Sequence, residues 1–252
     1  MGTYRMSVVA SLLFFFLVGC STGWPQPRLA DYLGSTPSPE GMPTALAKQG
    51  DVRAGFVVIN DTTAQGSAPQ LSPESLDSIK NYLQGLLTKE VSISLVRLNP
   101  PTQSSPPADT ASFLQMARGQ QLDYLVLAVV SSTEIEVPDR LPIGGSFNRG
   151  GMRGFLNGYR AENFARAELV LLEVGTGQAL LQSDGQAWAS LERLATPLES
   201  NVYPVVHRNI EMPPIYPTSE ESAHDVMRSV ASSEAINQAV MHFKESWKQA
   251  RG

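Results

Sequence analysis

Short apolar runs alternate with helical stripes in the first half of the folded body. The runs cover residues 54–60, 91–97 and 122–130. They are rich in β-branched residues, which predicts buried strands. After the first run, Ser72-Pro73-Glu74 offers an N-cap, a proline for the first turn and an acid near the positive end of the helix dipole. A second helix is expected from Asp109 or Thr110. Two successive strand–helix–strand steps predict parallel strands with right-handed crossovers.

The pattern changes after the third strand, which residues 131–137 continue. Residues 138–159 are rich in glycine and lack a clear period, so we expect an irregular loop. Two long strand-like segments follow, at 164–174 and 178–191, and Gly175-Thr176-Gly177 between them predicts a β-hairpin.

The C-terminal segment has a helical pattern from about residue 219. It follows a proline-rich stretch at 195–217, and Thr218-Ser219-Glu220-Glu221 has the spacing of a capping box. The expected packing face comprises Val226, Val230, Ile236, Val240, Phe243 and Trp247. The predicted fold class is therefore α/β (α+β mixed): a two- or three-layer mixed sheet in which β-α-β-α-β precedes a β-hairpin and a C-terminal helix.

The N-terminus has the pattern of an export signal. An apolar run at 7–18 follows Arg5 and ends in Leu17-Val18-Gly19-Cys20. The run is shorter than the roughly 20 residues that a membrane-spanning helix needs. The segment resembles a bacterial lipobox, which implies cleavage between Gly19 and Cys20 and attachment of acyl chains such as palmitate to Cys20. The alternatives are an ordinary signal peptide with a chance cysteine, or a buried N-terminal helix.

This interpretation predicts the domain organisation and the location. Residues 1–19 are a signal peptide, residues 20–50 are the lipidated cysteine and a flexible tether rich in Pro, Gly, Ser and Thr, and residues 51–252 are one periplasmic domain. More than one acyl chain gives firm membrane attachment. Ser21, where aspartate would favour retention in the inner membrane, favours the outer membrane, with the body in the periplasm or on the cell surface.

Composition excludes several classes of function. The 252-residue chain has a net charge of −5, which argues against generic nucleic-acid binding, because phosphate affinity depends on clustered Lys and Arg. Cys20 is the single cysteine. Its acylation would leave no thiol for disulfides, zinc–cysteine sites or thiol catalysis.

Three phrases, at 117–127, 171–177 and 178–182, sharpen the comparison with known families. They resemble the periplasmic α/β domain of curli-assembly lipoproteins and of lipoprotein activators of penicillin-binding proteins. The chain is equally similar to rhombotarget-type lipoproteins, in which a lipobox and a phrase like Asp31-Tyr32-Leu33 precede a comparable domain. The resemblance covers roughly residues 50–192. Residues 138–159 are too short and too polar to cross a membrane as strands, so a pore is not expected.

Residues with catalytic or metal-binding chemistry are few and scattered. His207, His224 and His242 have no ligand spacing, so no metal site is predicted, and no cofactor is expected besides the covalent lipid. Glu134 and Glu136 would share one face of a strand and could perform acid–base work, although a solvated strand edge is the simpler interpretation. Gly150-Gly151-Met152-Arg153-Gly154 does not match a phosphate-binding motif.

The loop at 138–160 is the candidate partner-binding site. Its candidate residues are Phe147, Arg149, Met152, Arg153, Phe155 and Tyr159. Aromatic, Met and Arg side chains are enriched in interface cores, so this loop is expected to dock a partner or a neighbouring copy. The alternative is that these side chains fold back onto their own core. The segment 203–217 is a second candidate.

Three functions remain open. The first is an anchored, non-catalytic module that binds an envelope protein or assists assembly, which suits a sequence without a catalytic signature. The second is an envelope hydrolase whose site follows no motif, with polar residues after the strands at Asp61-Thr62-Thr63 and Glu134-Ile135-Glu136. The third is a self-assembling structural lipoprotein, a homo-oligomer. Catalytic residues are not predicted.

Overall fold

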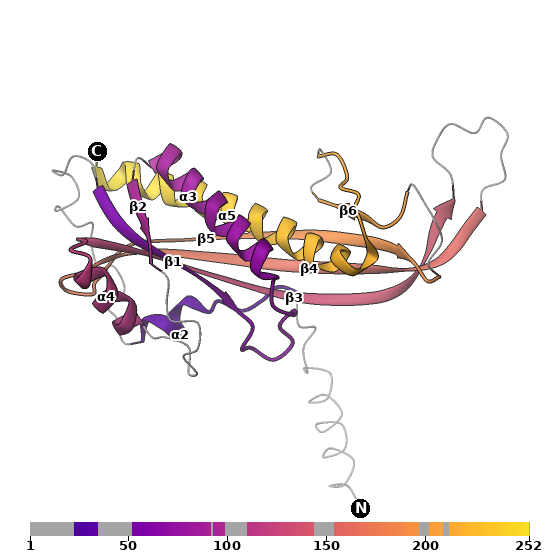
Figure 1. The fold of residues 1–252 in the computed structure, drawn as a ribbon, viewed down its shortest axis with the longest axis horizontal. Helices are drawn as coiled ribbons and strands as arrows, with labels where there is room; N and C mark the ends of the chain where they lie inside the picture. The colour runs from indigo at the N-terminus through magenta and orange to yellow at the C-terminus, as the bar shows by residue number, and fades with distance from the viewer. Residues whose placement is uncertain are drawn as a thin grey trace, which may run out of the picture.

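The computed structural model describes residues 23–34, 52–91, 93–98, 110–143, 154–196, 202–208 and 212–251. The strands are β1 (Val52–Asp61), β2 (Ile93–Arg97), β3 (Tyr124–Ile143), β4 (Gly154–Glu173), β5 (Ala179–Leu194) and β6 (Val205–His207). The described helices are α2 (Leu29–Leu33), α3 (Pro73–Val91), α4 (Thr110–Gly119) and α5 (Glu220–Arg251). The strands form one mixed sheet in the order β2-β1-β3-β4-β5-β6 (Figure 1). The α/β fold class predicted from the sequence is therefore confirmed.

The parallel part of the sheet is built as the pattern predicts. β1 pairs in parallel with both β2 and β3, and α3 and α4 make the two crossovers. The Ser72 hydroxyl accepts a 3.1 Å hydrogen bond from the Ser75 amide, so the expected cap forms. Val91 ends α3 instead of opening the next strand, which begins at Ile93.

Helices cover both faces of the parallel strands and create two hydrophobic cores. α3 and α5 lie over one face, and α4 with α2 lies over the other (Figure 1). Alternate residues of β3 pack into the two cores. The first core contains Tyr124, Val126, Ala128 and Val130, and the second contains Leu125, Leu127 and Val129. A strand that is buried on both faces needs apolar residues throughout, which explains the continuous run seen in the sequence.

The antiparallel half consists of long strands with α5 lying along them. β4 and β5 pair antiparallel, and Gly177, with φ of +75°, lies in the turn between them, so the predicted hairpin is confirmed. α5 begins at Glu220, close to the expected position, and the hydroxyl of the preceding Ser219 accepts a 3.2 Å hydrogen bond from the Ser222 amide. The segment predicted as irregular at 195–217 includes the short strand β6, which a bridge links to Ile215.

The packing face of α5 is only partly the predicted one. Ile236, Val240, Phe243 and Trp247 are buried, but Val226 and Val230 are only partly so. Alanines and one methionine complete the face: Ala223, Met227, Ala231, Ala235, Ala239 and Ala250. These small side chains let α5 approach β5 so closely that a Cβ on Gly185 would lie 2.3 Å from the Ala235 carbonyl oxygen.

The expectation of an irregular loop at 138–159 is wrong at both ends. β3 runs on through Pro138 to Ile143, and β4 already begins at Gly154. The proline is tolerated because the pairing of β3 with β1 ends at Ser131, which leaves this stretch of β3 at an edge of the sheet. Gly158 is required by close packing, since a Cβ there would lie 2.5 Å from both the Arg193 oxygen and a Leu141 methyl.

Candidate functional site

The paired ends of β3 and β4 form what we call the hairpin arm, residues 138–143 and 154–159. The pairing of β5 with β4 ends at Gly158, and the Ala195 amide donates one more hydrogen bond to the Asn157 carbonyl, so residues 154–156 pair with β3 alone. The arm therefore extends past the rest of the sheet (Figure 1). Phe155 and Tyr159, two of the predicted partner-binding residues, lie on it. Phe147, Arg149, Met152 and Arg153 lie outside the described residues.

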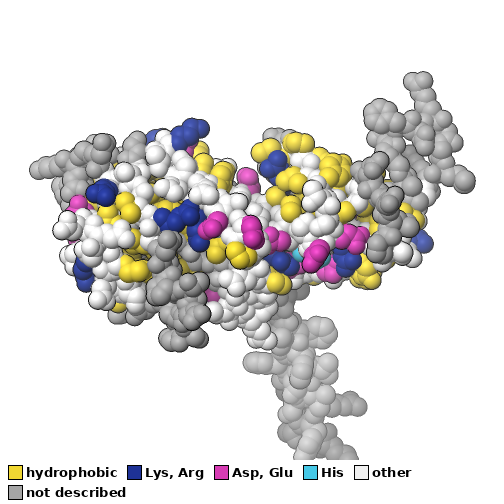
Figure 2. All heavy atoms as spheres, viewed as in Figure 1, with side chains coloured by type: hydrophobic (Ala, Val, Ile, Leu, Met, Phe, Trp, Pro, Cys, Tyr) yellow, Lys and Arg dark blue, Asp and Glu magenta, His cyan; other side chains and the backbone are white. Residues whose placement is uncertain are grey.

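Exposed apolar side chains surround the arm. Phe155 is 60% exposed, and Val202, Met212 and Tyr216 are exposed on the segments that flank β6. The Tyr203 hydroxyl donates a 3.0 Å hydrogen bond to the Pro142 carbonyl, which ties these segments to the arm. Figure 2 shows hydrophobic side chains gathered around β6. The second sequence candidate, 203–217, thus lies beside the first.

A shallow hollow of about 500 Å³ opens at the base of the arm. Its lining residues are Pro138, Asp139, Arg140, Asn157, Gly158, Tyr159 and Ala195. The Arg193 guanidinium lies 4.5 Å from the centre of the Tyr159 ring, and its Nε donates a 2.8 Å hydrogen bond to Glu136. These contacts hold the base of the arm in one geometry, as a binding surface requires.

The two glutamates predicted to share a face do so, and they meet α5. Glu134 Oε1 lies 2.7 Å from His224 Nδ1, and Arg228 Nε donates a 2.6 Å hydrogen bond to Glu134 Oε2. Burial would raise the pKa of Glu134, but the hydrogen bonds from His224 and Arg228 lower it below its ordinary value. Both oxygens of Glu134 are hydrogen-bonded to α5, so this cluster clamps α5 to β3.

The three histidines lie in separate places. His224 is in the clamp just described, His242 Nδ1 is 2.6 Å from the Asp184 carbonyl oxygen, and His207 Nε2 is 3.8 Å from Glu192. Within the described residues, no group of three or more His, Cys, Asp or Glu side chains is placed to hold a metal ion.

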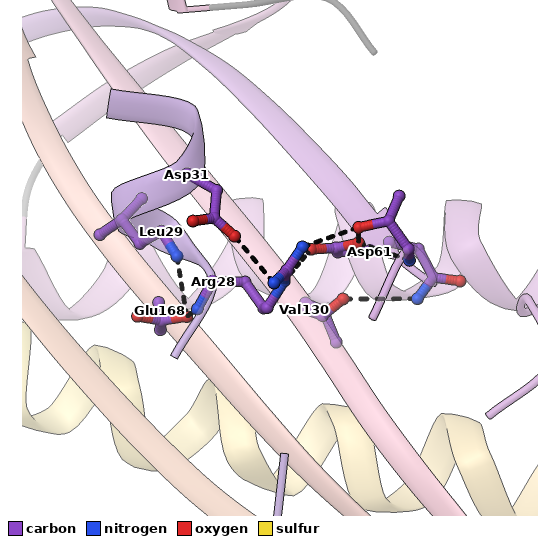
Figure 3. Close-up of polar contacts among 8 residues, drawn as sticks. Arg28, Leu29, Asp31, Asp61, Val130 and Glu168 are labelled. Carbon is purple, nitrogen blue, oxygen red and sulfur yellow. Dashed lines mark hydrogen bonds and ion pairs between the residues drawn. The ribbon is translucent and has the colours of Figure 1, made fainter. Parts of the chain in front are cut away.

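The N-terminal strap, residues Gly23–Gly34, docks on the sheet opposite α5 (Figure 3). Leu29 is fully buried in the second core. Arg28 Nε donates a 2.8 Å hydrogen bond to Asp61 Oδ2, and the amides of Arg28 and Leu29 donate to Glu168 Oε2 at 2.6 and 3.1 Å. The expected tether at 20–50 is thus replaced over 23–34 by packed structure.

Burial acts to raise the pKa of the three acidic groups in this contact, and hydrogen-bond partners reverse that effect for Asp61. Burial would raise the pKa of Asp61, but hydrogen bonds from Arg28 and Thr63 lower it below its ordinary value. Burial raises the pKa of Glu168, and the two backbone donors offset this only in part. Burial and the charge of Asp61 raise the pKa of Tyr32 to about 12.

Sequence reasoning missed the strap contacts. Their anchors, Asp61 and Glu168, lie 33 and 140 residues from Arg28, so no local pattern connects them. The available signal was Asp61 itself, an acid at the carboxyl end of a predicted buried strand. Cys20 and Gly19 lie outside the described residues, so the lipobox remains a prediction.

The chain has distant structural neighbours among known proteins, and those named here have TM-scores below 0.5. A scan against models of protein families finds no match, and a search of curated proteins finds none either. Among solved structures, the chain is similar to a PelC dodecamer from Paraburkholderia phytofirmans, at 13% identity and a TM-score of 0.33, over 77% of this chain and 88% of that one. The chain is also similar to a putative neuraminyllactose-binding hemagglutinin homolog from Helicobacter pylori, at 7% identity and a TM-score of 0.41, over 79% of this chain and 90% of that one. A third similar structure is a minor lipoprotein from Acinetobacter baumannii, at 9% identity and a TM-score of 0.32, over 78% of this chain and 95% of that one.

Among the helices of the described segments, none is both long and apolar enough to cross a bilayer.

Proposed function

We propose that this protein is a lipid-anchored, non-catalytic protein of the bacterial cell envelope that docks a protein partner through the hairpin arm. The observation that carries the proposal is the arm itself, which extends past β5 with Phe155 60% exposed at its side. Loops and extensions on a rigid scaffold are where binding residues concentrate. Exposed aromatic and apolar side chains, grouped with those near β6, are the composition expected of an interface core.

The anchor part of the proposal rests on the sequence. Leu17-Val18-Gly19-Cys20 closes a short apolar run, and Ser21 favours the outer membrane. The described residues begin at Gly23, three residues after Cys20, and the Thr133 hydroxyl holds Gly23 against β3. A chain held at Cys20 would therefore lie against the membrane, with the arm free to reach a partner.

Photo-crosslinking in cells tests the docking surface. A benzoylphenylalanine residue replaces Phe155 in one strain, and in the control strain it replaces Lys89, whose side chain is 80% exposed at the end of α3. We expect one discrete envelope protein to be captured from position 155 and not from position 89. The same product from both positions, or no product from position 155, would contradict the proposal that the arm docks a partner. Capture of a second copy of this chain would mean that the arm mediates self-assembly instead.

Metabolic labelling tests the anchor separately. Cells fed radiolabelled palmitate should label the protein, and Cys20→Ala should abolish the label and leave the precursor uncleaved. Label that persists in Cys20→Ala would contradict the lipobox.

A further inference from the structure

The antiparallel strands have one covered face and one bare face. α5 covers the face that carries Glu134 and Glu136, beyond the point where β3 leaves β1. On the opposite face, Thr133, Phe164 and Trp188 are cross-strand neighbours in one row. Two described segments contact this row: the strap, through Gly23 and Trp24, and the loop after β1, in which Ser67 forms a bridge with Thr133.

Large apolar side chains on this opposite face are open to solvent. Ile135 is 49% exposed, Val137 48% and Trp188 42%. Alternation along β3 places Ile135 and Val137 on the same face as Thr133. Trp24 joins them, because its ring meets the edge of Phe164 with centroids 5.2 Å apart and an interplanar angle of 67°. We call Trp24, Ile135, Val137, Phe164 and Trp188 the bare face.

The start of the strap lies on this face. The Thr133 hydroxyl donates a hydrogen bond to the Gly23 carbonyl, which fixes the start of the strap beside Phe164. Gly23 is three residues after Cys20. A fully extended chain spans at most about 3.5 Å per residue, so the Cys20 Cα lies within about 10 Å of Gly23.

We infer that the bare face rests on the lipid surface, with Trp24 and Trp188 at the boundary between headgroups and acyl chains. The inference rests on the proposed anchor at Cys20, which would hold this face within about 10 Å of the bilayer. Indole rings favour that boundary because one edge is polar and the body is apolar. The contact sets the orientation of the body, and the acyl chains supply the affinity.

The charges on this face define the kind of lipid surface. Arg160 is paired with Glu192 at 2.9 Å and with Asp139 at 3.2 Å, and Arg166 is paired with Asp184 at 3.5 Å. Glu162 lies opposite Ile135 in the register. These cations are already neutralised, so the face suits zwitterionic lipid and gains nothing from anionic headgroups.

Fluorescence quenching on vesicles tests the inference. The chain from Cys20 onward contains every described residue, and Cys20 is its single thiol. Coupling Cys20 to a maleimide lipid in phosphatidylcholine vesicles fixes the attachment without relying on cellular lipidation. We expect tryptophan emission to fall when the acyl chains are brominated, with Trp247 contributing little because it is buried in the core under α5. Trp188→Phe should remove part of this loss of emission, and Trp24→Phe should remove another part.

A matched protein controls the geometry. The double variant Cys20→Ser/Lys89→Cys attaches the same body through the end of α3. Its tryptophan emission should not change when the acyl chains are brominated. Ile135→Lys with Val137→Lys, which keeps all three tryptophans, should abolish the loss seen with Cys20 coupling while the circular dichroism stays unchanged.

The outcomes are distinct from those that test the proposed function. Equal quenching through Cys20 and through position 89, or none through Cys20, overturns the lipid contact. Absence of quenching together with chemically cross-linked dimers would assign the bare face to a second copy. A negative result on vesicles leaves the palmitate and photo-crosslinking experiments untouched, because the vesicle linkage is made chemically.

Discussion

Arg28 donates from Nε to the buried Oδ2 of Asp61 over 2.8 Å, and this contact joins the N-terminal strap to the carboxyl end of β1. Asp61 has a side chain only 1% exposed, and Thr63 supplies two further hydrogen bonds to it. A carboxylate at that depth requires donors, so docking of the strap is part of the folded state.

Removal of the arginine tests this contact. We expect Arg28→Ala to lower the free energy of unfolding by about 1–3 kcal/mol, because a buried carboxylate loses one of its donors. Urea denaturation at pH 7 measures the change. The control is Asp31→Asn, because the exposed Asp31 side chain also pairs with Arg28. This variant should change the free energy of unfolding by about 0.5 kcal/mol or less. Equal effects of the two variants would mean that the burial of Asp61 is not important.

Glu168 predicts an unusual pH dependence. Its pKa is raised in the folded state, chiefly by burial, so the stability it contributes is complete below its unfolded pKa and is lost as the pH rises through the folded pKa. The free energy of unfolding of Glu168→Gln, relative to the unmodified protein, should therefore increase as the pH rises through this window above about 4.3. Urea midpoints at several pH values would show it, and a constant difference would contradict it.

Glu134 should behave in the opposite way. Burial opposes its charge, but His224 and Arg228 lower its folded pKa, so its contribution is present above the unfolded pKa and is lost as the pH falls through the folded pKa. Glu134→Gln should therefore be less stable than the unmodified protein at pH 7, and the gap should close below about pH 4.3. Thermal unfolding followed by circular dichroism gives both values. A gap that widens in acid would refute the clamp.

Two glycine substitutions separate close packing from helix propensity. Gly185→Ala should lower the free energy of unfolding by about 1–3 kcal/mol, because its Cβ would lie 2.3 Å from the Ala235 oxygen and 2.4 Å from the Ala239 nitrogen. Gly85→Ala is the matched control in α3, where a Cβ meets nothing within 4 Å. It should raise stability by about 0.5–1 kcal/mol. Destabilisation by both would contradict the packing argument.

Local signals in the sequence predicted local structure well. Ser72 and Pro73 begin α3 as expected, because capping depends on neighbouring backbone groups. The continuous apolar run of β3 correctly indicated a buried strand. The turn at Gly177 likewise depends on adjacent residues.

The errors arise where distant partners decide the structure. Pro138 and Gly158 have the composition of a loop, yet pairing across the hairpin makes them strand. The face of α5 rests on alanines that fit against Gly185, and a search for large apolar residues overlooks them. The strap has the composition of a tether, and the residues that hold it in place, such as Asp61, Thr133 and Glu168, lie far along the chain.

The unbroken pairing of β3 with β4 has a mechanical consequence. Each strand contributes twenty residues, which run from beneath the helices to the tip of the arm. Antiparallel hydrogen bonds lie perpendicular to their strands. Opposed pulls on the two strands along their length would therefore load the whole ladder in shear at once, instead of peeling it apart bond by bond. The strap bonds to Glu168 on β4, so tension between a tethered N-terminus and a protein held at the tip would travel along these strands.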